Sequence, residues 1–222
     1  MTGVYVKSTL LGSLIAFCLN TQSVFADDAE PTPFHVNPRA EIPLRVGWNA
    51  LDLAFDGSEY HVLGQRNEIH TAHSNETFTF VDPQFNTVFF EPGQLLPRKL
   101  EFPATHANDV STAQGADYQL TSVRLLVDTS ARSSFVVVAM RERGHTYVDA
   151  RPVTLELFRF RRNGPDFQNG DPVSAFVLVA AYATRRCYHD SNDALVNELG
   201  LSRAAADERP MGVDRSAPCT SP

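Results

Sequence analysis

The alternation of apolar and polar positions predicts β-strands along most of this chain. The run from Leu51 to Phe55 alternates and ends at Asp56-Gly57, a dipeptide typical of tight hairpin turns. Longer runs rich in valine and leucine follow at 118–128, 133–141 and 173–184. Eight or more short strands at this spacing, separated by Pro and Gly turns, predict an all-β fold, either a β-sandwich or a small barrel.

In one strand-like run, the alternation of apolar and polar positions changes phase. In residues 153–160, apolar side chains occupy odd positions as far as Leu157 and even positions from Phe158 onward. Because successive residues of a strand point to opposite faces, this predicts either a bulge near Leu157 or a strand that is covered on both faces. Trp48, in an alternating segment, is expected to lie in the core.

Helical spacing is confined to the C-terminal part. Asp190 or Ser191 is placed to cap a short helix that would stop at Gly200. The fold class predicted is therefore all-β with a short C-terminal helix.

The first 26 residues have the pattern of a secretory signal peptide. Lys7 precedes an apolar core from Leu10 to Leu19, and Ser23 to Ala26 forms a small-residue cleavage site. The apolar core is too short to span a bilayer, and no later run reaches the roughly 20 residues that a transmembrane helix needs. We therefore expect a protein exported to the periplasm or the cell exterior, with no membrane span after signal cleavage.

Four segments follow from these patterns. We expect a signal peptide at 1–26, a proline-rich extended arm at 27–43, a β-sandwich domain at 44–186, and a helix with a disulfide-tied tail at 187–222. Cleavage leaves 222 − 26 = 196 residues, enough for one substantial domain.

Signal cleavage would remove Cys18 from the mature chain. Of three cysteines, Cys187 and Cys219 remain, and an even pair in an oxidising compartment predicts one disulfide. The alternative is that Cys187 is a nucleophile assisted by His189, but residues two apart do not generally present their side chains for mutual catalysis.

The charge balance limits the partners. The mature chain has 18 basic and 26 acidic residues, a net charge of −8, which argues against nucleic acid. All but two of the 19 basic residues are arginines, and seven of these 17 form clusters at 141–143, 159–162 and 185–186. These clusters predict either solvated rims that protect sheet edges or a docking surface for an acidic partner.

The segment from Leu125 to Ala131 carries the sharpest candidate for catalysis. Its Asp128-Thr129-Ser130 resembles the Asp-Thr-Gly segment of retropepsin-like aspartic proteases, in which two such carboxylates share one proton. The resemblance implies a hydrolase with Asp128 as a catalytic residue. However, Ser130 replaces the usual Gly and the chain holds no second copy, so a dimer would have to supply it. The alternative is an ordinary turn in which short polar side chains bond the backbone.

His70 and His73 form an HxxH pair and are weak candidates for metal ligands. The alternative is a pair of loop histidines with no metal, and we expect no cofactor. Motifs of serine hydrolases, zinc proteases and nucleotide-binding proteins are missing from the sequence.

These features predict an exported, non-enzymatic binding or structural protein. Export, a β-sandwich, a proline-rich arm and the missing catalytic motifs favour an accessory component of a cell-envelope, secretion or surface-appendage assembly, with other envelope or secreted proteins as partners. The alternative is a secreted hydrolase acting through Asp128.

Overall fold

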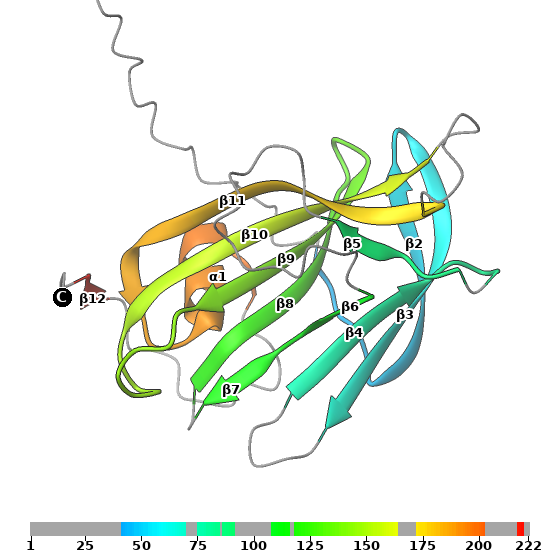
Figure 1. The fold of residues 1–222 in the computed structure, drawn as a ribbon. Helices are drawn as coiled ribbons and strands as arrows, with labels where there is room; N and C mark the ends of the chain where they lie inside the picture. The colour runs from blue at the N-terminus through cyan, green and yellow to red at the C-terminus, as the bar shows by residue number, and fades with distance from the viewer. Residues whose placement is uncertain are drawn as a thin grey trace, which may run out of the picture. The chain divides into compact units, whose positions relative to one another are not determined.

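Two β-sheets and one helix make up the described part of the chain in the computed structural model (Figure 1). The structure describes residues 41–69, 75–84, 86–91, 108–115, 118–163, 172–202 and 217–219. The prediction of an all-β sandwich with a short C-terminal helix and one disulfide is confirmed. No helix within these residues is long and apolar enough to span a bilayer.

The larger sheet has the strand order β1-β8-β9-β10-β11-β12. Its strands are β1 (Glu41–Ile42), β8 (Tyr118–Asp128), β9 (Ser133–Arg141), β10 (Arg151–Arg162), β11 (Ser174–Tyr188) and β12 (Ala217–Pro218). Two short strands join it, β5 (Phe89–Glu91), parallel to β11, and β7 (Ala113–Gly115), antiparallel to β8. β1 lies within the segment predicted as an extended arm, so the sheet begins three residues before Leu44.

The smaller sheet has the order β2-β3-β4-β6. Its strands are β2 (Gly47–Phe55), β3 (Ser58–Ile69), β4 (Asn75–Val81) and β6 (Asp109–Ser111). The β2–β3 hairpin turns at Asp56 and Gly57, whose φ angles are 51° and 79°. Positive φ at both turn residues matches the right-handed twist of the strands, which explains why this dipeptide sets the hairpin.

Two apolar clusters cover the two faces of the larger sheet. Between the sheets, aromatic side chains such as Phe80, Phe158 and Phe176 pack against valines and leucines. On the opposite face, α1 (Ser191–Leu199) packs its Leu195 and Leu199 against the sheet (Figure 1). The larger sheet is therefore buried on both sides where α1 covers it.

This double burial explains the phase change along β10. Its register against β9 runs without a shift, and Leu157 packs with α1 whereas Phe158 packs between the sheets. The irregularity lies on the neighbouring strand: Leu157 is opposite Ala180 and Phe158 is opposite Leu178, so Val179 is an extra residue of β11. Of the two interpretations, the strand covered on both faces holds for β10.

The ends of α1 carry the predicted caps. The Asp190 side chain accepts a hydrogen bond from the Asn192 N–H, and Gly200 adopts a left-handed conformation with φ of 67°. In contrast, the expectation that Trp48 lies in the core is wrong, because its side chain is 55 % exposed.

Candidate functional site

Asp128 lies where β8 ends and turns into β9. Its Oδ1 accepts hydrogen bonds from the Ser130 hydroxyl at 2.6 Å and from the Ser130 and Ala131 N–H groups, each at 2.9 Å. The Ser130 hydroxyl, followed by the Ala131 N–H, lowers the pKa of this carboxyl. The geometry is that of a turn closed by an aspartate side chain.

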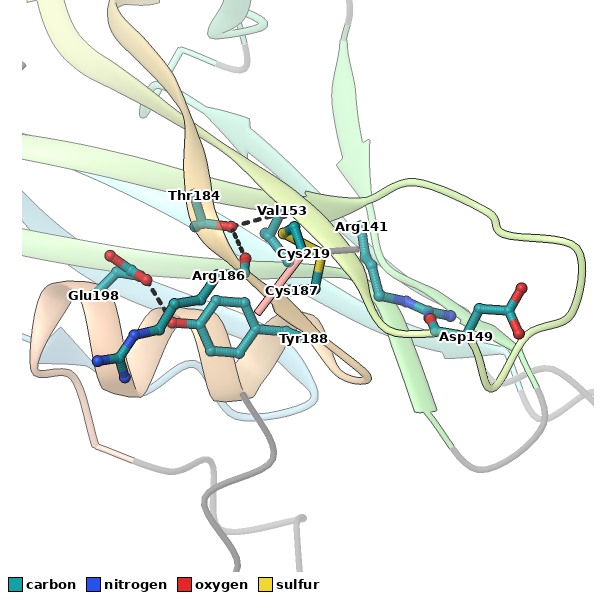
Figure 2. Close-up of a disulfide and its surroundings, with 9 residues drawn as sticks. All are labelled: Arg141, Asp149, Val153, Thr184, Arg186, Cys187, Tyr188, Glu198 and Cys219. Carbon is teal, nitrogen blue, oxygen red and sulfur yellow. Dashed lines mark hydrogen bonds between the residues drawn. A yellow bond between two sulfur atoms is a disulfide. The ribbon is translucent and has the colours of Figure 1, made fainter. Parts of the chain in front are cut away.

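The disulfide joins Cys187 on β11 to Cys219 beside β12, with 5.0 Å between the Cα atoms (Figure 2). Cys187 is buried and bonded, so it is not a free nucleophile in this structure. Next to it the register between β10 and β11 shifts, and the Thr184 hydroxyl fills the gap. It accepts from the Val153 N–H at 3.0 Å and donates to the Arg186 carbonyl at 2.7 Å (Figure 2).

The arginine clusters have separate roles. Arg141 is buried and donates to the Tyr147 and Asp149 carbonyls, which holds the β9–β10 loop. The guanidinium groups of Arg159 and Arg162 lie over aromatic rings of the β2–β3 hairpin. Arg141, Arg159 and Arg162 thus anchor a loop and pack against the hairpin, a role that neither interpretation of the clusters predicted.

The proposed metal ligands His70 and His73 lie outside the described residues. Among the residues that the structure does describe, no group of three His, Cys, Asp or Glu side chains is placed to hold a metal ion.

The free edge of β2 is the best candidate for a functional surface. In the described part of the chain β2 pairs with β3 alone, in an unshifted register from Phe55–Ser58 to Gly47–Arg66. The residues next to a two-residue turn form a hydrogen-bonded pair, and such pairs alternate with non-bonded ones. The N–H and C=O groups of Trp48, Ala50 and Asp52 therefore point away from β3.

Ala54 supports this assignment. It belongs to the same alternating set, and its N–H donates to the Ser134 hydroxyl of β9 at 2.8 Å, away from β3. β9 thus closes the edge at this end, and no other strand of the described ranges covers the edge at residues 47–52.

Hydrogen bonds of the Asn49 side chain fix the conformation of residues 45–49, where this edge begins. The Asn49 amide donates to the carbonyls of Arg45 at 2.8 Å and Gly47 at 3.0 Å, and its Oδ1 accepts from the Arg45 N–H at 2.9 Å. Gly47 has a φ of 92°, a conformation that favours glycine. The segment holds Val46 and Trp48 outward, 59 % and 55 % exposed.

In the described part of the chain, short strands cover two stretches of the outer edge of β11, whereas no strand covers the outer edge of β2. β5 covers residues 175–177 and β12 covers residues 186–187, and two register shifts interrupt its pairing with β10. Short covering strands and bulges are the devices by which proteins prevent unwanted strand pairing. β2 carries a regular register and an exposed Trp instead.

Sequence reasoning missed this site, although one signal was available. Trp48 is out of phase with Leu51 and Leu53, the two buried leucines of β2, so alternation places it on the outer face.

No family model and no curated protein matches the chain. Among solved structures, the crystal structure of CarG is similar to it, with 19 % sequence identity and a TM-score of 0.51. The match covers 72 % of this chain and 98 % of that one. At this identity the similarity supports a shared fold and says nothing about function.

Proposed function

We propose that this chain is an exported, non-enzymatic binding protein that docks onto another envelope or secreted protein through the free edge of β2. The observation that carries the proposal is the exposed Trp48 on a preorganised, unguarded strand. Tryptophan is enriched among the residues that dominate binding energy, and preorganisation lowers the entropy lost on binding. Such a protein would serve as an accessory component of an envelope, secretion or appendage assembly.

The backbone of β2 specifies the partner's conformation. The outward N–H and C=O groups of Trp48, Ala50 and Asp52 match an extended segment that adds a strand to the sheet. The open stretch of six residues, 47–52, spans about 20 Å. We therefore expect a partner segment of about six residues, with an apolar side chain over Trp48.

Site-specific photocrosslinking in the producing cell tests this proposal. A photoreactive residue is placed at position 48, 50 or 52, and Val148, a 50 % exposed residue of the β9–β10 loop, is the control position. The three β2 positions should capture one partner at sites two residues apart along one segment. Capture at β2 no stronger than at position 148 would overturn the proposal.

Two variants separate side-chain from backbone recognition. Trp48→Ala should weaken partner binding by about 30-fold, the loss typical of a binding hot spot. Ala50→Pro removes an outward N–H and no hydrogen bond to β3, so binding should fall while the hairpin stays intact. Val148→Ala is the matched control, and unchanged melting temperatures would show that all three variants fold.

A further inference from the structure

Glu156 is an acidic residue enclosed in the middle of β10. It is 0 % exposed, and neither carboxyl oxygen has a hydrogen-bond partner among the residues that the structure describes. Buried carboxylates are normally paired with a cation or hydrogen-bonded, because an unpaired buried charge is strongly unfavourable. An enclosed carboxyl without partners is tolerated far better as a neutral acid than as an anion.

The carboxyl faces the interior of the sandwich. Glu156 lies opposite Val138 of β9 and Ala181 of β11. Val138 belongs to the apolar cluster between the sheets, as does Phe158, two residues further along β10. Leu157, on the other face, packs with α1.

The groups around Glu156 offer no compensating charge. Its neighbours on this face of the three strands are Val138, Met140, Thr154, Phe158, Ala181 and Ala183. β2, which packs against β10, buries Leu51 and Leu53. The nearest arginine of β10 in sequence, Arg159, has its guanidinium over the Phe55 ring of β2, 5.7 Å from the ring centroid. Burial alone raises the pKa of Glu156 to about 7.

We propose that Glu156 makes the sandwich pH-responsive: the closed fold holds it as a neutral acid, and loss of its proton loosens the packing of β10 between the two apolar clusters. This property is independent of docking at β2. Within the described part of the chain no group is placed to stabilise the charged carboxylate. Its ionisation therefore requires water to reach the carboxyl, which happens only when the interior opens.

Whether the free energy of unfolding rises or falls with pH depends on which state, folded or unfolded, holds the proton of Glu156. The unfolded chain releases it near pH 4.5, the ordinary value for glutamate, whereas the folded protein retains it to about 7. Between these values the folded state binds more protons, so the free energy of unfolding falls as the pH rises. The decline is complete above the folded pKa; below pH 4.5 both states hold the proton, so the group adds no further pH dependence.

Urea unfolding of the purified protein between pH 4 and pH 9, followed by circular dichroism, tests the proposal. The unfolding equilibrium constant of the natural protein, divided by that of Glu156→Gln, should rise on the order of 100-fold across this range. Glu142→Gln, at an exposed loop position, is the matched control and should leave the pH curve unchanged.

A second variant is used in case the buried amide of Glu156→Gln prevents folding. Glu156→Met removes both polar atoms, and amide hydrogen exchange then reports on β10 itself. Above pH 7, β10 amides of the natural protein should exchange faster than the chemical rate increase explains, and those of Glu156→Met should not. A pH-independent stability ratio, or equal β10 exchange in both proteins, would overturn the proposal.

Discussion

At the residue scale, two carboxyl groups of the larger sheet show how strongly local surroundings decide chemical behaviour. Asp128 has three hydrogen-bond donors within one turn, and its pKa is lowered. Glu156 has none and is enclosed by apolar side chains, and its pKa is raised. Asp128 carried the sequence resemblance to a catalytic segment, yet the unusual group is Glu156, an acid inside an apolar run.

Substitution of Asp128 tests its assignment to the turn. Asp128→Ala should lower the free energy of unfolding by about 1 kcal/mol, because the turn loses its acceptor. Asp128→Asn keeps an acceptor oxygen and should lose less. Since the folded pKa lies below the unfolded one, the contribution is present at neutral pH and disappears as the pH falls through that folded value. Any peptidase activity that Asp128→Asn abolished without unfolding would contradict the structural role.

At the element scale, the strands that alternate regularly were predictable and their pairing was not. β8 and β9 begin and end at the predicted residues, and Asp56-Gly57 turns the hairpin, because alternation and turn chemistry are local. Which edges stay open depends on pairing between distant segments. The guarded edge of β11 and the open edge of β2 therefore had no local signal, apart from the parity of Trp48.

The cap of α1 also joins two elements. Asp190 is 1 % exposed; its Oδ1 accepts from the Asn192 N–H at 2.8 Å and its Oδ2 from the Gln119 N–H of β8 at 2.9 Å. Asp190→Ala should lower the free energy of unfolding by roughly 2 to 4 kcal/mol, the sum of a cap and a buried bond to a charged group. Asp190→Asn keeps the cap, so its free energy of unfolding, measured with urea, should lie between those of the natural protein and Asp190→Ala. Equal losses in both variants would contradict this, because they would show that the cap contributes nothing and that the bond to the Gln119 N–H accounts for the whole effect.

At the scale of the whole molecule, the disulfide acts on the unfolded chain. It joins residues 32 apart and holds β12 on the edge of β11. The chain-entropy estimate for a loop of this length is roughly 3 to 4 kcal/mol of stabilisation. Cys187→Ala/Cys219→Ala should lose about this much in denaturant unfolding, and a reducing agent should then have no further effect. A stability equal to that of the oxidised protein would show that the tail needs no covalent tie.

Trp48 is the only tryptophan of the chain, and it stands on the open edge of β2. The tryptophan fluorescence of this protein therefore originates at the candidate docking surface and not in its interior. A partner strand laid over the indole would exclude water and shift the emission to shorter wavelength, whereas unfolding moves an already exposed ring into a similar environment. The fluorescence of Trp48 thus reports docking without an added label and responds little to unfolding of the core.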